Sequence, residues 1–324
     1  MNDSSKLPNH RFSGHETFAC RYAWLPKVIH ALSQEDKRDI LTVAREDDAM
    51  VELGLGKNMV RSARFWSEAT GIIQPIEGRH QITEFGYDLL LGSVNDEGYD
   101  PYLEDIQTLW LIHWKLATNQ SSLIFAWDFL LNHFHEPELY ASSVVRAFEK
   151  AVPQYSEKAI SRGSLEQLYE VFIHSYIPTR GRKGEVREDN LDCPLVELEL
   201  LRGTGSFAAK DGRSEPKYAF RREDKPEISA ALFAFCLQEF WSSRYSQEQS
   251  LPFHSVVVGA GSPGQVFKIP EMDIRKRLLG IEEDTQGYFA FEESAAIPRL
   301  VKRENVMPPS LGLVYDYSGA SYAR

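Results

Sequence analysis

The sequence of 324 residues is poor in cysteine and lacks long apolar runs. Its three cysteines, Cys20, Cys193 and Cys236, are far apart and form no Cys-x-x-Cys pair. A disulfide framework and a thiolate zinc site both need more closely spaced cysteines, so neither is expected. No stretch approaches the roughly 20 apolar residues that cross a bilayer. The polar N-terminus has no signal-peptide core. We therefore expect a cytoplasmic, soluble protein.

An excess of positive charge is also missing. The chain has 36 Lys and Arg against 47 Asp and Glu, a net charge of −11. A non-specific nucleic-acid coat protein needs summed positive charge, so that class is excluded, whereas a local basic patch is not. Several catalytic signatures are absent as well: the P-loop, the His-x-Glu-x-x-His zinc motif and the nucleophile elbow. Glu197-Leu198-Glu199 lacks the lysine of a restriction-type nuclease core.

What is present begins with a helix-turn-helix pattern. Helical periodicity over residues 35–53 breaks at Gly54 and Gly56 and resumes over 57–69. Residues 72–83 then read as strand, polar turn and strand, which is typical of the wing of a winged helix. Thr83 is suited to cap the short helix that follows, and Gly92 to end it.

The remaining pattern completes a fold that is mainly α with small β wings. Helical periodicity continues to residue 178, and 179–190 read as a charged linker. A hairpin, an aromatic helix, a short strand or buried run near 251–259, a helix from about Pro270 and a final hairpin follow. The predicted domains are an N-terminal segment with a winged helix-turn-helix (1–95), a helical middle (96–178), a winged-helix-like α/β C-terminal domain (190–305) and a tail (306–324).

Five segments resemble a bacterial family of phosphorothioation islands, the SspB-like family, long described as a domain of unknown function. They read RFSGHETFACRYAWLPK, ELGLGKNMVRSARFW, ITEFG, DPYLEDIQTLWLIHW and SPGQVFK. The resemblance implies a component of single-strand DNA phosphorothioation and anti-phage defence that nicks one DNA strand to permit sulfur incorporation. It also implies partners: an ATPase, an ATP pyrophosphatase-like sulfur transferase and a cysteine desulfurase.

The second helix of the helix-turn-helix is the predicted DNA-reading element. The N-terminal half of a recognition helix contacts base edges, where Arg pairs with guanine and Asn with adenine. Arg79 would extend the contact from the wing. A protein-binding or purely structural winged helix is the alternative. The candidate DNA-binding residues here are Lys57, Asn58, Arg61, Ser62, Arg64 and Arg79.

The N-terminal motif mixes polar groups with large aromatics. His15 and Glu16 are candidates for handling a proton or a metal, and Arg21 for clamping a DNA phosphate. The equally weighted alternative is structural: Ser13 or Thr17 caps a helix while the aromatic side chains dock it.

The acidic segment Asp100, Glu104 and Asp105 offers carboxylates that could hold Mg²⁺ or Mn²⁺ for phosphodiester hydrolysis. Acidic residues also favour the positive end of a helix, and that interpretation is preferred here. No organic cofactor is expected.

A second basic region, with Arg182 and Lys183, is suited to grip backbone phosphates. A solvated loop is the alternative for that region. The aromatic pair Trp110 and Trp114 is expected in the core. Three functions remain open: a DNA-binding nickase of double-stranded DNA, a non-catalytic DNA-binding adaptor or transcriptional regulator, and a scaffold that never touches DNA.

Overall fold

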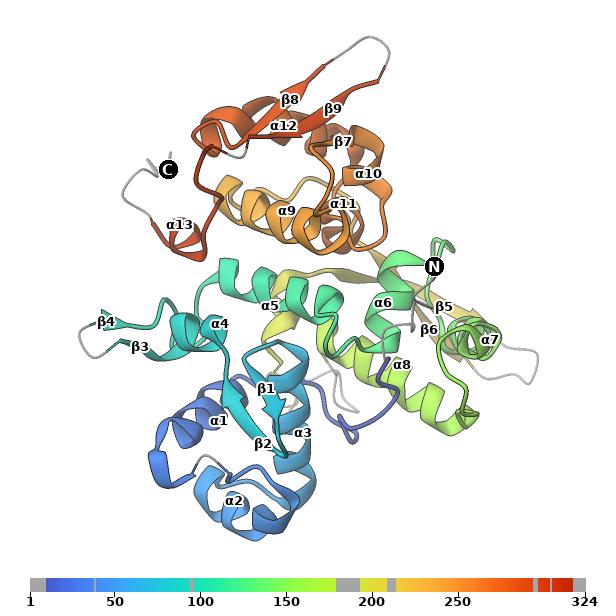
Figure 1. Cartoon of the computed structure of the whole chain (residues 1–324). Coiled ribbons are helices and arrows are strands. Elements are labelled where there is room, and N and C mark those ends of the chain that lie inside the picture. The colour runs from blue at the N-terminus through green and yellow to red at the C-terminus, as the bar shows by residue number, and fades with distance from the viewer. Residues whose placement is uncertain are drawn as a thin grey trace, which may run out of the picture. The chain divides into compact units, whose positions relative to one another are not determined.

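The computed structural model describes residues 10–37, 39–93, 96–178, 193–208, 214–293, 297–303 and 305–316. The chain forms two compact units, unit 1 (Met1–Arg221) and unit 2 (Arg222–Arg324), and each is described by itself. Helices dominate both units, and the strands form small antiparallel sheets (Figure 1). The predicted class, mainly α with small β sheets, is confirmed.

Unit 1 begins with three helices and a hairpin. Gly54, with a φ of 63°, ends the second helix and Gly56 precedes the third, so the predicted glycine turn is confirmed. Glu77 and Gly78 both have positive φ, as a two-residue type I′ hairpin turn requires. The elements are α1 (Trp24–Ser33), α2 (Glu46–Leu53), α3 (Lys57–Ala69), β1 (Ile73–Ile76) and β2 (Arg79–Ile82).

The first helix has a proline near its start, and the second helix is shorter than predicted. Helix α1 begins at Trp24, and Pro26 lies in its first turn, where a missing backbone N–H breaks no helical hydrogen bond. The helix predicted over 35–53 is confined to α2, with two short 3₁₀ turns before it, Glu35–Lys37 and Val43–Arg45.

Thr83 begins the connection to the helical middle. Its Oγ1 accepts a hydrogen bond from the Gly86 amide at 3.0 Å, as predicted for a cap. Gly86 approaches Ile72 so closely that an added Cβ would lie 2.3 Å from the Ile72 carbonyl oxygen. The segment comprises α4 (Glu84–Gly86), the π-helix η3 (Tyr87–Leu91), β3 (Gly92–Ser93) and β4 (Asp96–Glu97).

The helical middle of unit 1 packs around aromatic side chains. Trp110, Trp114 and Trp127 are fully buried, so the predicted core role of the first two is confirmed. The Tyr176 hydroxyl lies 2.8 Å from Trp127 Nε1 and 2.7 Å from His113 Nδ1, which satisfies these polar groups inside the core. The helices are α5 (Ile106–Thr118), α6 (Phe125–Asn132), α7 (Ala141–Ala151), the 3₁₀ turn η4 (Val152–Gln154) and α8 (Arg162–Tyr176).

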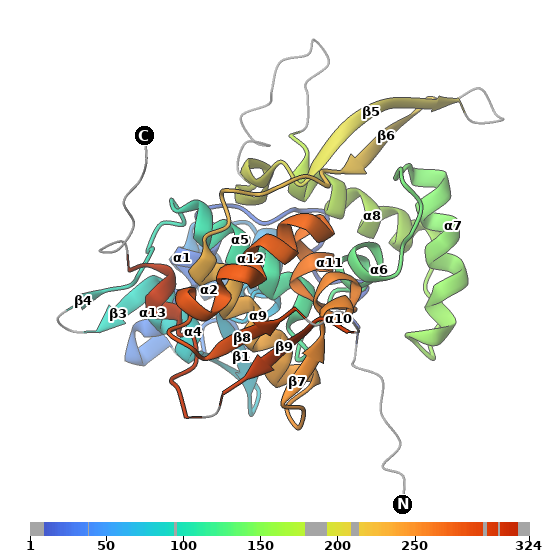
Figure 2. The same ribbon diagram turned by 90° about the horizontal axis from the view of Figure 1, so that it is seen from above.

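The long hairpin predicted after residue 200 is present and belongs to unit 1. It follows the 3₁₀ turn η6 (Pro194–Leu198) and consists of β5 (Leu201–Ala208) and β6 (Ser214–Phe220). Tyr218 and Leu139 exchange both backbone hydrogen bonds, at 2.7 and 2.9 Å, which ties β6 to the segment before α7. Figure 2 shows this hairpin beside α7 and α8.

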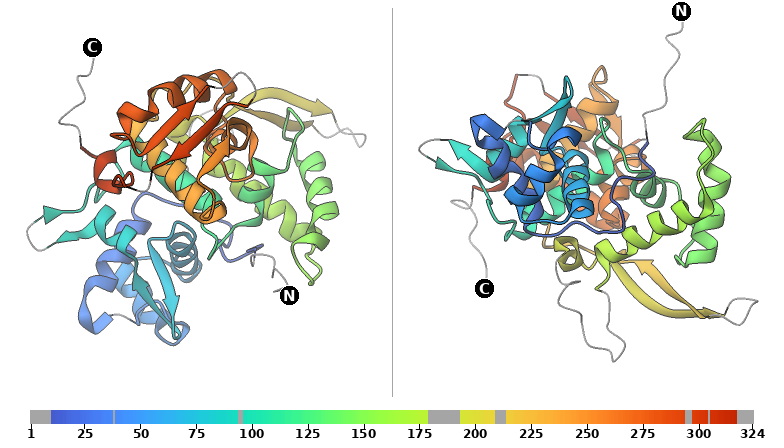
Figure 3. Two further views of the ribbon diagram at one scale, coloured as in Figure 1. Left: turned by 45° about the horizontal axis from the view of Figure 1, so that its top comes forward. Right: turned by 90° about the horizontal axis from the view of Figure 1, so that it is seen from below.

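Unit 2 combines helices with a three-stranded antiparallel sheet in the order β7-β9-β8. The first helix of the unit lies against the sheet (Figure 3, left), and Trp241 on that helix stacks on Phe289 of the sheet with ring centroids 5.6 Å apart. The elements are α9 (Ala230–Arg244), β7 (Ser250–Pro252), α10 (Phe253–Val258), α11 (Pro263–Phe267), α12 (Glu271–Asp284), β8 (Phe289–Glu292), β9 (Arg299–Lys302) and α13 (Leu311–Val314).

The predicted helix from about Pro270 and the final hairpin are confirmed. The run near 251–259 is a strand only up to Pro252, because Phe253 and Val256 are buried at helical spacing in α10. Residues 259–262 of the glycine-rich segment form a turn, and Ser262 caps α11, which begins at Pro263. Within the described ranges, no helix has both the length and the apolar character needed to span a membrane.

Candidate nucleic-acid interface

Helix α3 exposes its N-terminal end and buries the rest of its length. It packs against α1, α2 and β1 (Figure 1), and Val60, Ala63 and Trp66 lie in the core. Lys57 and Asn58 are exposed and Arg61 is half-buried. Three of the predicted DNA-binding residues are therefore gathered on one accessible end of the helix, which also carries the positive end of the helix dipole.

The cations at this end share one carboxylate, Glu46 on α2. Arg61 contacts it twice, with Nε 2.5 Å from Oε1 and Nη2 3.2 Å from Oε2, and Lys57 Nζ lies 3.0 Å from Oε2. Hydrogen bonds from Arg61 and Lys57 lower the pKa of Glu46 to about 2. Glu46 is therefore ionised at neutral pH and offsets one of the two positive charges.

Ser62 does not belong to this surface, and that prediction is wrong. It follows Arg61 by one residue, which turns it about 100° around the helix. It is fully buried, and its Oγ donates to the His15 carbonyl at 3.0 Å. Arg64 is half-buried and also turns inward: its Nη1 donates to the Leu41 carbonyl at 3.0 Å, which anchors the segment before α2.

The hairpin contributes one accessible cation. Arg79 is exposed at the start of β2, beside the turn. His80 points back to α3, where its Nε2 lies 2.9 Å from Glu68 Oε1. Glu68 also accepts from Arg11 Nη1 at 2.7 Å. Burial opposes ionisation of Glu68, but the hydrogen bond from His80 and the charge of Arg11 keep its pKa below the usual value.

The N-terminal motif forms a support for α3. His15 is only 2% exposed, its Nδ1 donates to the Glu16 carbonyl at 2.8 Å, and its ring meets Phe65 edge-on. Burial lowers the pKa of His15 to about 4, so the ring is neutral at pH 7. A group enclosed in this way cannot reach a phosphodiester, and the predicted catalytic role of His15 does not fit its position.

The neighbouring residues of this motif also have structural contacts. Glu16 is in the left-handed conformation, with a φ of 53°, and its carbonyl accepts a hydrogen bond from the Gln167 side chain. The guanidinium of Arg21 lies over the rings of Phe18 and Trp24 at 5.7 and 5.5 Å. The alternative prediction, in which Ser13 or Thr17 caps a helix, is wrong because α1 begins only at Trp24.

The acidic segment before α5 serves as a helix cap. The two carboxylate oxygens of Asp100 accept from the amides of Glu104 and Asp105, both at 2.9 Å. Asp105 caps α5 by accepting from the Gln107 amide at 2.8 Å. Glu104 is exposed. This geometry supports the helix-terminus interpretation and does not fit a metal centre at Asp100.

Metal ligands are not gathered elsewhere in the described part of the chain. No group of three or more His, Cys, Asp or Glu side chains is placed there to hold a metal ion. Arg182 and Lys183 lie outside the described residues. Lys217, a cation that follows these two in the sequence, is paired with Glu138 at 2.7 Å.

Sequence reasoning missed Glu46 and Arg11. Glu46 precedes Lys57 and Arg61 by 11 and 15 residues, and only the turn between α2 and α3 brings them together. An acidic residue in the first turn of α2 was the available signal, but it reads equally well as a helix-dipole contact. Arg11 reaches Glu68 across 57 residues of chain, which no local pattern predicts.

Comparisons with known proteins add a family and a fold. The family model described as "Protein of unknown function (DUF4007)" matches residues 12–310. Two solved structures, described as magnesium ion-bound SspB and SspB, have TM-scores of 0.76 and 0.75 and are each 24% identical to the chain. Each match covers 97% of this chain and 86% of the solved chain. No match was found among the curated proteins.

Proposed function

We propose that the chain, which belongs to the DUF4007 family, is a DNA-binding component of a bacterial DNA phosphorothioation and anti-phage defence system. The observation that carries the proposal is the accessible, cationic N-terminal end of α3. The three helices followed by a hairpin have the order of a winged helix-turn-helix, in which this helix reads the major groove. The fold shared with SspB supports the assignment to phosphorothioation.

Each exposed group has a distinct role in this proposal. Asn58 is free to meet a base edge, where an Asn side chain pairs with adenine. Lys57 contacts a phosphate, and Arg79 reaches the backbone from the hairpin. Arg61 holds Glu46 through Nε and Nη2, which leaves Nη1 to face the duplex. A phosphate close to Lys57 competes with Glu46 for the same cation.

The finer proposal is that the protein nicks one strand to permit sulfur incorporation, with Mg²⁺ or Mn²⁺ as the metal. The buried His15 and the capping Asp100 and Asp105 do not form a reaction centre, so no step through a metal is derived from them.

The second candidate function is a non-catalytic adaptor or transcriptional regulator. It would recruit the ATPase, the ATP pyrophosphatase-like sulfur transferase and the cysteine desulfurase to DNA. The structural roles of the three residues His15, Asp100 and Asp105 favour this candidate.

A plasmid assay separates these functions. Supercoiled plasmid is incubated with the protein and Mg²⁺ or Mn²⁺, with and without a chelator, and duplex binding is measured in parallel. Nicked circles that disappear with chelator and with the Lys57→Gln/Arg61→Gln variant support the nickase. Duplex binding without nicked circles supports the adaptor. A protein that neither binds nor nicks duplex DNA contradicts both.

A further inference from the structure

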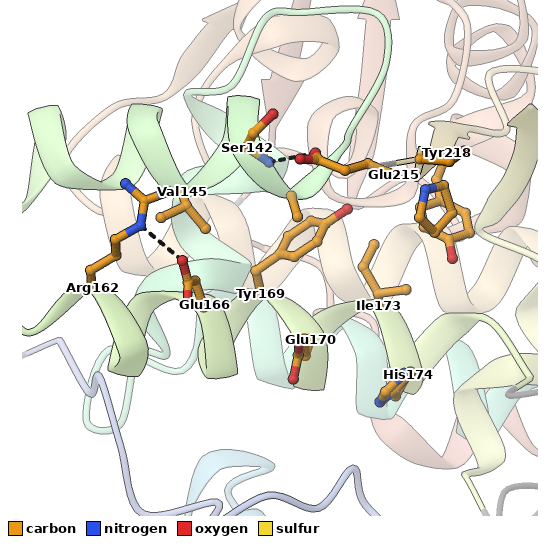
Figure 4. Close-up of a pocket in the computed structure, with 13 residues that line it drawn as sticks. Ser142, Val145, Arg162, Glu166, Tyr169, Glu170, Ile173, His174, Glu215 and Tyr218 are labelled. Atoms are coloured by element: carbon orange, nitrogen blue, oxygen red, sulfur yellow. Dashed lines mark hydrogen bonds and ion pairs between the residues drawn. The ribbon is translucent and has the colours of Figure 1, made fainter. Parts of the chain in front are cut away.

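A pocket in unit 1 is lined by residues outside α3 and its hairpin. It is formed by α7, α8 and β6 and has a volume of about 540 Å³, within the usual size of small-ligand sites. Val145 and Ile173 supply apolar wall, and Tyr169 and Tyr218 supply aromatic wall. Figure 4 shows the side chains of α7, α8 and β6 converging on this space.

Tyr169 carries a polar group that the described residues leave unsatisfied. The side chain is 5% exposed, and its hydroxyl has no hydrogen-bond partner within the described part of the chain. Figure 4 shows this hydroxyl directed toward the side of the pocket that holds Ile173, Glu215 and Tyr218. Burial, together with Tyr218 and Glu215, raises the pKa of Tyr169, so the phenol stays neutral. An enclosed, unpaired hydroxyl is costly unless a ligand satisfies it.

The charge lining the pocket is negative. Glu166, Glu170 and Glu215 line it against one cation, Arg162. Arg162 is already committed, with Nε 2.8 Å from Glu166 and Nη1 3.2 Å from Glu149. One oxygen of Glu215 accepts the Ser142 amide at 2.9 Å, and the other oxygen remains an acceptor. The pocket therefore offers carboxylates and a phenol oxygen to an N–H donor, and it repels phosphate.

We propose that this pocket binds an aliphatic organic cation, an alkylammonium or guanidinium group on an apolar stem. The head group donates to Glu215 and to the Tyr169 hydroxyl. The stem lies against Val145 and Ile173. The group comes either from a free amine or from a Lys or Arg side chain of a protein. This proposed ligand site does not depend on whether α3 binds DNA or whether the protein nicks it.

The test is isothermal titration calorimetry of the full chain with three probes at physiological ionic strength. Agmatine and spermidine stand for free amines, and a capped tripeptide with one central lysine stands for a protein side chain. We expect saturable binding of at least one probe. Binding of the tripeptide alone identifies a protein side chain as the source, and binding of agmatine or spermidine alone identifies a free amine.

Variants locate the binding. Tyr169→Phe and Glu215→Gln should each weaken it at least about tenfold, since a hydrogen bond to a charged group is lost in each case. Glu157→Gln makes the same charge change at an exposed site off the pocket and should bind like the wild type. Chemical-shift changes in the unmodified protein should map to α7, α8 and β6, which covers the case in which a variant fails to fold.

Two results would overturn the proposal: no saturable binding of any probe, or equal affinity in the wild type, Tyr169→Phe and Glu215→Gln. Either result leaves the proposed DNA-binding function untouched, because the plasmid and duplex assays do not involve this pocket.

Discussion

The two units each contain a helical module that ends in a hairpin, and the two modules present opposite chemistry. The module of unit 1 is α1–α3 with β1–β2, and that of unit 2 is α9–α12 with β7–β9. Helix α3 begins with Lys57 and Asn58 and has no acidic residue in its first turn. Helix α12 has Glu271 and Asp273 in its first turn and exposes Met272.

This difference shows that the order of elements does not decide the partner. The order of a helix and a hairpin determines the backbone shape of the module. The charges in the first turn of the helix determine whether the module attracts a polyanion. Met272 on α12 is 76% exposed and Leu279 is 60% exposed, which is unlike a phosphate-binding surface. The DNA-binding proposal is therefore confined to α3, and the predictions below test the contrast.

The largest expected effect concerns one glycine in each unit, Gly264 in the first turn of α11 and Gly54 at the end of α2. An added Cβ at Gly264 would lie 2.2 Å from the Val257 carbonyl oxygen, so Gly264→Ala should destabilise unit 2 by more than about 3 kcal/mol. An added Cβ at Gly54 would meet only Lys27 Nζ, at 3.9 Å, but the φ there is 63°, so Gly54→Ala should cost about 1 kcal/mol. Denaturant unfolding of both variants measures the two values. Equal losses would mean that the two glycine positions are equally constrained.

The second prediction concerns acid stability and His15. The folded pKa is about 4 and the unfolded value is the ordinary 6.5. As the pH falls from 6.5 to 4, the unfolded chain takes up a proton that folded His15 refuses, so the free energy of unfolding decreases. The loss amounts to about 3 kcal/mol and is complete below pH 4.

Hydrogen exchange of the α3 amides against pH checks this loss, and His15→Gln should flatten the profile between pH 6.5 and 4.5. His254, the only histidine in the sequence of unit 2, is exposed, and His254→Gln serves as the control for replacing a histidine outside unit 1. A His15→Gln profile with the wild-type slope would contradict the prediction.

The third prediction concerns charge reversal. Lys57→Glu/Arg61→Glu should weaken duplex binding about 100-fold, since two favourable contacts become repulsive. Lys276→Glu on the exposed face of α12 is the matched control and should have little effect. Fluorescence anisotropy across a salt series measures both. In the milder Lys57→Gln/Arg61→Gln variant, the salt slope should fall by about two units. If the α12 variant weakens binding as much, the contrast between the modules is wrong.

The smallest expected effect concerns Glu46. Glu46→Gln removes the carboxylate that competes with DNA for Lys57 and Arg61, so duplex affinity should rise about three- to tenfold. Glu271→Gln makes the same change in the first turn of α12 and should leave affinity unchanged. The same fluorescence-anisotropy assay measures the duplex affinity of both variants. Weaker binding by Glu46→Gln would show that Glu46 orients the cations for DNA and does not compete with it.

Local sequence features determined the elements and their order. Glycines at 54 and 56, the Glu77–Gly78 turn and the Thr83 cap act over two to four residues, so the sequence alone places α2, α3, the turn between them and the hairpin. Apolar residues that recur about every 3.6 positions identified the helical middle and its buried tryptophans. Backbone conformation and the burial of one helix face both depend on residues that are close together in the sequence, so a local pattern can predict them.

Only the tertiary structure decided where the polar side chains point. Arg61 and Ser62 are adjacent in sequence, yet one lies at the surface beside Glu46 and the other lies under the N-terminal motif. Tyr169 on α8 and Glu215 on β6 are 46 residues apart in the sequence. They line the same pocket only because β6 pairs with the segment before α7. Charged and hydroxyl groups pair with groups on the elements that pack beside them. Packing between segments that are distant in the sequence produces no periodic pattern, so these pairs cannot be predicted from the sequence.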